Sequence, residues 1–282
     1  MKKVAVINDL SGFGRCSLTA ALPVLAAMGT QPVPLPTAML SAQTGYPDYT
    51  YLDLTGQMHG IRRAWQSMGV RFDGISTGFV ANPAQFNQLN AFLDTFQRED
   101  TLVMVDPVMG DGGHAFGMFS PALLEGMRGL CYRGTLLVPN LTECCLLTNW
   151  DYSALTAHKG EQDYTERVSA CGEALRRPGQ TVVITGVQVP GEDGSPTVGN
   201  LALWAGGTFF LAQPYNGKSY SGTGDLFAAA LLGALLRGET VPQAVERAER
   251  FLSAAIAAAA REGTDRNDGV PYEAFLGMLL PF

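Results

Sequence analysis

The sequence predicts an α/β protein with a mostly parallel central sheet that is covered by helices on both faces. Short, almost continuously apolar runs alternate with longer segments of helical period, which is typical of strands that are buried on both sides. The connections are rich in turn formers, with 33 Gly and 16 Pro in 282 residues. With 46% hydrophobic and 16% charged residues, the composition supplies a large core and excludes global disorder.

Each expected strand is a run of β-branched or aliphatic residues bounded by Gly, Pro or Asp. These strands are residues 4–7, 32–35, 74–77, 102–105, 136–138, 182–185, 201–204 and 208–211. The expected helices are residues 17–28, 57–68, 83–97, 121–128, 142–148, 164–176, 225–237 and 241–261. The last two strands flank Ala205-Gly206-Gly207 and are expected to form an edge hairpin. The polar turn at 190–196 is expected to join two strands, so residues 1–282 are predicted to be one domain.

Composition also narrows the class of function. The 26 acidic residues exceed the 19 basic ones, giving a net charge of −7, which argues against nucleic-acid binding through phosphate contacts. The five cysteines form no C-x-x-C pair, so we expect free thiols in a reducing compartment. The first residues are typical of a strand rather than a signal peptide, and no apolar run reaches the roughly 18 residues of a membrane span. We therefore expect a cytoplasmic protein that binds neither nucleic acid nor membrane.

Four local patterns suggest functions that their surroundings do not support. Residues 12–17 approximate a dinucleotide-binding fingerprint, but residues 34–37 (PLPT) stand where that fingerprint needs an acidic residue. Residues 12–17 are therefore expected to form a tight turn, and both a turn that binds a ligand and one that binds none are open alternatives. Residues 74–78 match the G-x-S-x-G of hydrolases, but no helix is expected directly after Ser76, so a serine hydrolase is a remote alternative. Residues 217–219 lack the rest of a P-loop, and residues 140–142 form a glycosylation sequon without a secretory signal.

The strongest pattern is Ser221-Gly222-Thr223-Gly224-Asp225, which precedes an apolar helix. Two glycines around a threonine allow several backbone N–H groups to face one point, where the helix N-terminus adds the positive end of its dipole. Such a loop suits a phosphoryl group in transfer. Because an aspartate beside it would repel phosphate, we interpret Asp225 as a base for the attacking hydroxyl rather than as a residue that only compensates the helix dipole.

Polar side chains follow several other predicted strands. In a doubly wound sheet the carboxyl ends of the strands share one edge, where ligands bind. Oxygen ligands with few histidines suit Mg²⁺ and phosphates better than zinc. The residues expected to converge with Asp225 are Asp9, Asp106, Asp111, Asn140, Glu143 and Thr185. For each of them alone, a helix cap or a solvated loop is the alternative.

Together these motifs resemble the ribokinase-like superfamily, whose G-T-G-D signature matches residues 222–225. Residues 106–111 (DPVMGD) and 138–143 (VPNLTE) resemble the D-P-V-[ML]-G-D and T-P-N-x-x-E motifs of its vitamin kinases, and residues 41–46 (SAQTGY) resemble the S-N-H-T-G-Y of pyridoxal kinases. The resemblance extends from the first strand to the helix at Asp225. It implies a ribokinase-like three-layer α/β/α sandwich and an ATP-dependent kinase that phosphorylates the 5′-hydroxymethyl group of pyridoxal, pyridoxine or pyridoxamine.

The resemblance also implies a role for each matching residue. Asp225 would be the base, and Gly222, Thr223 and Gly224 the anion hole. The Mg²⁺ and nucleotide side would comprise Asp106, Asp111, Asn140, Glu143, Thr185, Lys218 and Ser221, with Asp106, Asp111 and Glu143 as the metal residues. The vitamin side would comprise Asp9, Ser11, Thr44 and Phe79. We expect Mg²⁺ with ATP, a monovalent cation as a further candidate cofactor, and a homodimer.

Three departures from the family pattern bear on the substrate. Asp9-Leu10-Ser11 stands where pyridoxal kinases usually have S-H-V and resembles the start of hydroxymethylpyrimidine kinases. Phe79 replaces the usual tyrosine of G-Y, and Val138 replaces the threonine of T-P-N-x-x-E. A hydroxymethylpyrimidine kinase is therefore the nearest alternative. A non-catalytic sensor of ATP or a pyridoxal compound is the alternative from another class, and the intact Asp225 argues against it.

Overall fold

The computed structural model describes residues 1–280, and its chain divides into two units, each of the α/β class. The first unit contains Met1–Met104 and the segment that begins at Ser219, and the second contains Val105–Lys218. The chain passes from the first unit to the second within strand β5 (Leu102–Val105). The alternation of apolar runs and helical segments thus predicts the fold class correctly.

The first unit is built on a sheet in which β1 is central. Its strands are β1 (Lys3–Phe13), β2 (Gln31–Ala42), β3 (Tyr51–Asp53), β4 (Gly74–Thr77) and the start of β5. Their order is β5-β4-β1-β2-β3, with β1 parallel to β2 and β4, and β3 antiparallel to β2. The β-branched and small residues from Val4 to Ile7 are almost completely buried, as a strand covered on both faces requires.

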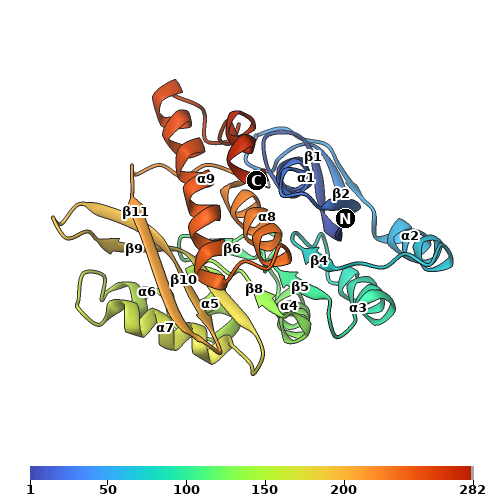
Figure 1. The fold of residues 1–282 in the computed structure, drawn as a ribbon, viewed down its shortest axis with the longest axis horizontal. Helices are drawn as coiled ribbons and strands as arrows, with labels where there is room; N and C mark the ends of the chain where they lie inside the picture. Colours follow the sequence, from blue (N-terminus) through green and yellow to red (C-terminus); the bar gives the residue numbers. More distant parts are fainter. Residues whose placement is uncertain (281–282) are drawn as a thin grey trace. The chain divides into compact units, whose positions relative to one another are not determined.

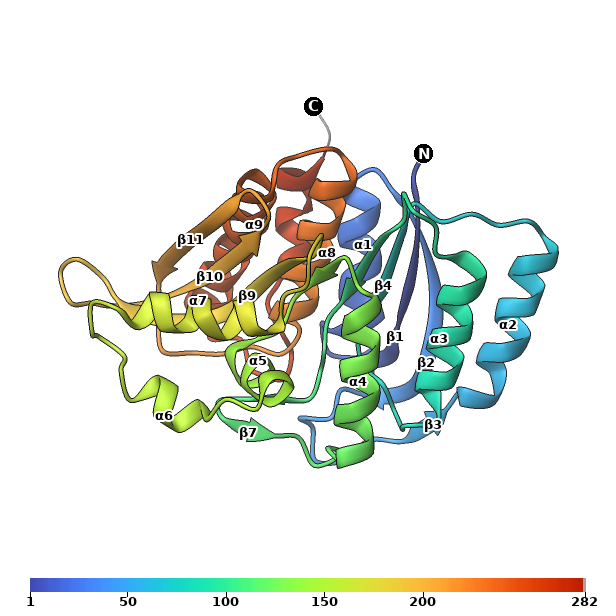
Figure 2. The ribbon, with the colours of Figure 1, turned by 90° about the horizontal axis from the view of Figure 1, so that it is seen from below.

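Helices cover both faces of this sheet, which gives the unit three layers. They are α1 (Ser17–Ala27), α2 (Thr55–Ser67), α3 (Gln85–Phe96), α8 (Thr223–Leu236), α9 (Val241–Glu262) and a 3₁₀ helix at Tyr272–Leu279. Figure 2 shows α2 and α3 in front of β1, β2 and β4, with α1 and α8 behind them. Helix α8 packs between α1 and α9 (Figure 1), and its residues from Leu226 to Ala234 are buried, so it is apolar on every side.

The second unit combines one parallel strand pair with three antiparallel pairs, one of which is the separate pair of β6 (Gly110–Asp111) and β7 (His114–Ala115). Its strands β8 (Leu136–Leu137), β9 (Thr181–Pro190), β10 (Pro196–Trp204) and β11 (Gly207–Pro214) have the order β11-β10-β9-β8, and only β8 and β9 are parallel. The edge hairpin and the strand-joining turn at 190–196 are confirmed. The other elements are α4 (Pro121–Arg133), α5 (Leu141–Thr148), α6 (Tyr152–Thr156) and α7 (Tyr164–Leu175), with α5 and α7 packed on β9 (Figure 2).

Strand β2 carries prolines at alternate positions. Pro32, Pro34 and Pro36 pair in register with Val4, Val6 and Asn8 of β1. The N–H of Gln31 donates to the carbonyl of Lys2, so the alternate proline nitrogens face away from β1. On that side β3 pairs only with Ala38–Leu40, and the proline-bearing half of β2 is the free edge of this sheet in the described part of the chain.

The structure corrects several element boundaries. Strand β1 continues past a bulge between Asn8 and Leu10 until Phe13, so Gly12 lies in a strand and not in the predicted turn. Helix α3 begins only at Gln85, and Ser76 is therefore not on a strand-to-helix elbow of the hydrolase type. The short elements β3, β6, β7, α6 and the 3₁₀ helix were not predicted, because runs of two to eight residues show no clear period.

Two further expectations concern thiols and hydropathy. All five cysteines are buried as free thiols, as predicted, with the sulfur atoms of Cys144 and Cys171 3.5 Å apart. Within residues 1–280, no helix has the combination of length and apolar character needed to cross a bilayer.

Candidate active site

Asp225 lies in the first turn of α8 and is held from two directions. Its Oδ1 accepts a hydrogen bond from Asn8 Nδ2 (3.0 Å), and its Oδ2 accepts one from the Ser17 backbone N–H (2.8 Å). One donor belongs to β1 and the other begins α1, so the carboxylate is fixed beside the bulge of the central strand and the start of α1. A carboxylate held in this way is suited to accept a proton from a hydroxyl group in one defined direction.

Asn8 is a site residue that the sequence analysis missed. Its Oδ1 accepts hydrogen bonds from the backbone N–H groups of Asp9 (3.0 Å) and Phe79 (2.8 Å). With the oxygen occupied by two donors, the amide nitrogen must face Asp225. The available signal was a polar residue that interrupts an apolar strand directly before Asp9, and Asn8 is almost completely buried.

Burial shapes the electrostatics of Asp225 and Asp9. It raises the pKa of Asp225 from 3.8 to about 6, the negative charge of Asp9 adds to that shift, and the bonds from Ser17 and Asn8 oppose it. Burial also raises the pKa of Asp9, while hydrogen bonds from Ser17 and Ser11 oppose the change. The Ser11 hydroxyl donates to Asp9 Oδ2 at 2.7 Å. Two carboxyl groups with raised pKa values therefore stand beside the start of α8.

The loop before Asp225 has the geometry of an anion-binding loop. Gly222 is the N-cap of α8 with φ 79° and ψ 0°, a left-handed conformation, and it offers no side-chain acceptor to the first turn. The Thr223 hydroxyl turns back to the Tyr220 carbonyl (3.0 Å). The N–H groups of the first turn are thus not capped by a side chain of the N-cap residue, which is how a helix start receives a phosphate.

The remaining vitamin-side residues have different environments. Phe79 contributes its backbone to the site, because its N–H donates to Asn8 while its ring packs against Ala38, Leu40 and Ala81. Thr44 is exposed in the loop between β2 and β3. The structure thus brings Asp9, Ser11 and the Phe79 backbone to the Asp225 cluster, and it places Thr44 on a separate loop of the same unit.

In the second unit, the start of α5 gathers three of the predicted nucleotide residues. Asn140 is the N-cap, and its Oδ1 accepts the Glu143 N–H (2.9 Å), while Glu143 Oε2 accepts the Asn140 N–H (2.9 Å). This is a reciprocal capping box. Thr185 lies beside it, since its N–H donates to the Pro139 carbonyl (2.9 Å) and it forms a parallel bridge with Asn140.

The segment 106–111 is tied to the same helix start. Asn140 Nδ2 donates to the Gly110 carbonyl (2.7 Å), and Glu143 Oε1 accepts the Met109 N–H (3.0 Å). Burial raises the pKa of Glu143, which is only 3% exposed, and the charge of Asp111 adds to the increase. Asp111 is exposed and accepts the Gly112 N–H (2.8 Å), Asp106 is half-buried, and Lys218 is exposed in a turn.

Among residues 1–280, no three or more His, Cys, Asp or Glu side chains are grouped so that they could hold a metal ion. Both oxygens of Glu143 already accept backbone N–H groups. Mg²⁺ on a nucleotide is usually held by one or two carboxylates together with substrate phosphates and water, rather than by a cage of protein ligands. The exposed Asp111 and half-buried Asp106 fit that mode.

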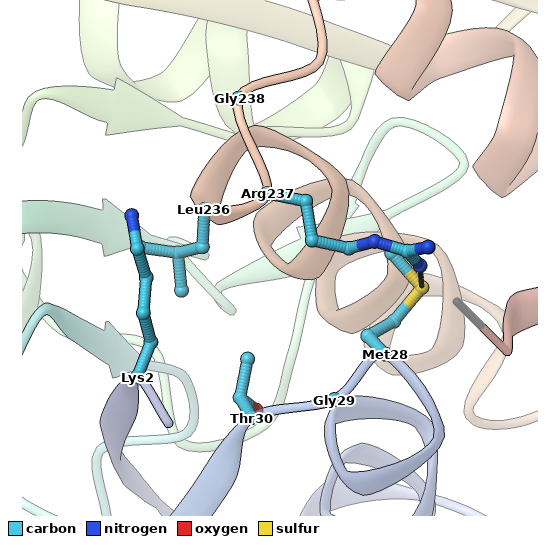
Figure 3. Close-up of a pocket in the computed structure, with 7 residues that line it drawn as sticks. All are labelled: Lys2, Met28, Gly29, Thr30, Leu236, Arg237 and Gly238. Atoms are coloured by element: carbon cyan, nitrogen blue, oxygen red, sulfur yellow. Dashed lines mark hydrogen bonds between the residues drawn. The ribbon is translucent and has the colours of Figure 1, made fainter. Parts of the chain in front are cut away.

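A pocket of about 320 Å³ lies at the opposite edge of the first unit. Lys2 and Thr30 precede β1 and β2, and Leu236, Arg237 and Gly238 end or follow α8. Figure 3 shows the Arg237 side chain reaching Met28, whose sulfur accepts a contact from Nη1 at 3.6 Å. Because the pocket is at the carboxyl end of α8, it is separate from the Asp225 cluster at the amino end.

Comparisons with known proteins show that the chain belongs to a family of kinases. The sequence model of the phosphomethylpyrimidine kinases matches residues 18–269. A pyridoxine/pyridoxal/pyridoxamine kinase from Bordetella avium is 30% identical over 252 residues, which are 87% of this chain and 81% of that protein. A hydroxymethylpyrimidine/phosphomethylpyrimidine kinase from Bacillus subtilis is 29% identical over 189 residues, which are 66% of this chain and 64% of that protein.

Two solved structures are similar over almost the whole chain. Pyridoxal kinase from Lactobacillus plantarum has a TM-score of 0.87 and 29% identity, and the match covers 99% of this chain and 96% of that one. A protein from Bacteroides thetaiotaomicron, assigned to the phosphomethylpyrimidine kinases and crystallised with pyridoxal, has a TM-score of 0.88 and 34% identity, with 100% and 96% covered.

Proposed function

From the chain's membership of the phosphomethylpyrimidine kinase family, and of the ribokinase-like superfamily with its pyridoxal kinases, we propose that this phosphotransferase uses ATP to phosphorylate the 5′-hydroxymethyl group of a B6 vitamer. The observation that carries the proposal is Asp225, held by Asn8 and Ser17 at an anion-binding helix start. A B6 vitamer rather than a pyrimidine is supported by the Bordetella avium relative, which matches 87% of the chain, against 66% for the Bacillus subtilis pyrimidine kinase. The family match includes residues of both units, which supports a single kinase domain over 1–282.

The proposed reaction needs one proton acceptor and a site for transferred charge. Asp225 accepts the proton of the 5′-hydroxyl group while the hydroxyl oxygen forms a bond to the γ-phosphorus of ATP. The bond between the γ-phosphorus and the bridging oxygen of the β-phosphate breaks, which releases ADP. The backbone N–H groups of residues 222–225 stabilise the negative charge of the transferring phosphoryl group. Asn8 and Ser17 keep Asp225 aimed at the acceptor, and Asp9 with Ser11 would bind polar groups of the ring.

The residues of the nucleotide side belong to the second unit, except Ser221, which belongs to the first. Asn140 and Thr185 would contact ATP phosphates. Lys218 and Ser221 are assigned to the same nucleotide side. Asp106 and Asp111 would hold Mg²⁺, directly or through water, together with the buried carboxyl of Glu143. When bound with ATP, Mg²⁺ would neutralise charge on the phosphate oxygens. The expected homodimer, the cytoplasmic location and a monovalent cation stay predictions.

A panel of acceptors tests the proposed substrate. ADP release with ATP and Mg²⁺ is measured for pyridoxal, pyridoxine, pyridoxamine, hydroxymethylpyrimidine and its phosphate, and each phosphorylated product is identified by mass. We expect the highest kcat/KM for a B6 vitamer, with hydroxymethylpyrimidine at least about tenfold lower, as a site built around specific hydrogen bonds discriminates. Preference for the pyrimidine would favour the alternative kinase, and no turnover of any acceptor would favour a sensor. Asp225→Asn is run in parallel to exclude a contaminating kinase.

The raised pKa of Asp225 predicts an early loss of activity in acid. A base acts only in its ionised form, and with a pKa of about 6 the ionised fraction falls through that pH rather than near the ordinary 3.8. We expect kcat/KM for the vitamin to decrease by about tenfold for each pH unit below 6. The measurement is a profile from pH 4.5 to 8.5 at saturating ATP, with circular dichroism to show that the protein stays folded. A rate that is constant down to pH 5 would contradict the raised pKa.

A further inference from the structure

A short loop after α9 contacts three separate segments of the first unit. Residues 266–268, here called the clip, present three consecutive backbone carbonyl groups, and each accepts a hydrogen bond from a different segment. The three bonds are Ser221 N to Arg266 O (3.0 Å), Gln43 Nε2 to Asn267 O (3.2 Å) and Arg15 N to Asp268 O (3.2 Å). One loop thus joins the anion-binding loop, the 43–46 loop and the turn between β1 and α1.

The side chains of the clip make further bonds to the 43–46 loop. Asn267 Nδ2 donates to the Gly45 carbonyl (3.0 Å), and the Tyr46 hydroxyl donates to Asp268 Oδ1. The Tyr46 ring also meets the Phe13 ring edge to face, with centroids 5.4 Å apart. Burial raises the pKa of Tyr46 to about 12, and its bond to Asp268 adds to that shift. Tyr46 is therefore a neutral donor throughout the physiological range.

The side chains of Asn267 and Gln43 lie close against Gly45. A Cβ atom at Gly45 would collide with Asn267 Oδ1 and lie 2.7 Å from Gln43 Nε2. The Gly45 N–H is itself occupied by Gln43 Oε1 at 2.7 Å. The clip is shaped in turn by Asp265, whose Oδ1 accepts the Asn267 N–H (2.8 Å). A side chain at position 45 would displace the Asn267 and Gln43 side chains, and their hydrogen bonds to Gly45 hold the backbone beside Thr44.

We propose that Asn267 and Asp268 are positioning residues that hold the 43–46 loop, and with it Thr44, in the conformation that binds the acceptor ring. The proposal deepens the proposed function, since it rests on Thr44 facing the acceptor. Thr44 is exposed and lies outside any helix or strand, so its position depends on the bonds of its neighbours. If the loop adopts its binding conformation only part of the time, apparent affinity falls by that fraction. Acceptor binding should therefore depend on a loop that is more than 200 residues away in sequence.

Steady-state kinetics of Asn267→Ala, Asp268→Ala and Tyr46→Phe test the proposal. We expect KM for the acceptor to increase roughly five- to tenfold in each, the effect of one lost hydrogen bond, while kcat and KM for ATP stay within about twofold. Asp268→Asn keeps an acceptor oxygen for Tyr46 and should restore a KM close to that of the unchanged protein. Glu246→Gln, on the exposed side of α9, is the matched control for the loss of a carboxylate.

A double variant and hydrogen exchange complete the test. Tyr46→Phe combined with Asp268→Ala should increase KM no more than either change alone, because both remove the same bond. Amide exchange of residues 43–46 should accelerate in Asp268→Ala and not in Asp268→Asn. The proposal is overturned if melting temperature falls while both KM values stay unchanged, or if Asp268→Asn is as impaired as Asp268→Ala.

The proposed vitamin activity can fail without affecting this test. KM is measured for whichever acceptor the unchanged protein phosphorylates best, so a pyrimidine preference alters the substrate and not the expected ratio. Amide exchange needs no substrate at all. If Asp268→Ala does not fold, Tyr46→Phe removes the same bond from the other partner and carries the measurement.

Discussion

Asp225→Asn is expected to lower kcat by about 10²–10⁴-fold with little change in KM for ATP, which is the size of effect that removal of a general base produces. The substitution keeps the shape of the side chain and one of its acceptor oxygens. It removes the only group of the Asp225 cluster that is proposed to take the proton of the acceptor hydroxyl. The bonds from Asn8 and Ser17 make the site rigid, so no water is expected to take over the role with equal efficiency.

Stability measurements separate this loss from misfolding. Burial of ionised Asp225 costs folding free energy at neutral pH, as its raised pKa records, and asparagine removes that cost. Asparagine also turns one donor group toward Asn8 or Ser17, so one hydrogen bond is lost. Because the two effects oppose each other, we expect the melting temperature to change by no more than a few degrees. Asp100→Asn, on an exposed turn, is the control, and normal turnover in Asp225→Asn would reject the assignment of the base.

Gly222→Ala should be the second most damaging change, with kcat reduced about 10²-fold by displacement of the anion-binding loop. Gly222 has φ 79°, and a Cβ atom there would collide with the backbone carbonyl of Arg15. Because the obstacle is backbone, either the turn between β1 and α1 or the start of α8 must move. Both hold Asp225, the first through Ser17 and the second directly, so the base and the N–H groups lose their alignment together.

Gly238→Ala provides the matched control for this prediction. Gly238 has φ 89° at the other end of α8, and a Cβ atom there would meet nothing within 4 Å. It therefore carries the left-handed strain of about 1–2 kcal/mol without the collision. We expect a lower melting temperature and normal kcat in Gly238→Ala, and a larger loss of both in Gly222→Ala. Equal melting temperatures and equal kcat values in the two variants would show that the structure accommodates a Cβ atom beside the Arg15 carbonyl without displacing the anion-binding loop.

The fold was predictable where local pattern decides structure. Gly74–Thr77 and Leu102–Val105 are short apolar runs between clear breakers, and both strands begin and end where the sequence predicts. Strand β1 was predicted to end at residue 7, but it continues to Phe13 because Leu10, Ser11 and Phe13 pair with Met39, Leu40 and Ala42 of β2. That pairing joins segments that are far apart in sequence. Residues 8–13 include polar residues and a glycine, so their composition alone does not predict a strand.

Within the candidate site, only contacts between residues close in sequence can be read from a local pattern. The reciprocal bonds of Asn140 and Glu143 lie within four residues and form the helix cap that the sequence analysis gave as the alternative to a site role. Asn8 and the clip were missed, because each acts on a residue more than 200 positions away. Asn267 and Asp268 belong to an unremarkable polar turn in the sequence. Only in the folded chain does that turn lie beside the 43–46 loop, to which it is hydrogen bonded.

The alternating prolines of β2 have a consequence for self-association. An unpaired strand edge ordinarily offers a row of N–H donors and carbonyl acceptors to any other extended chain, which is the usual first step of aggregation through sheet extension. Pro32, Pro34 and Pro36 remove every second N–H from β2, and these are the ones that would face outward. The free half of this edge can accept hydrogen bonds but cannot donate them. It therefore cannot be extended by a regular strand, and two copies of the chain cannot join their sheets there.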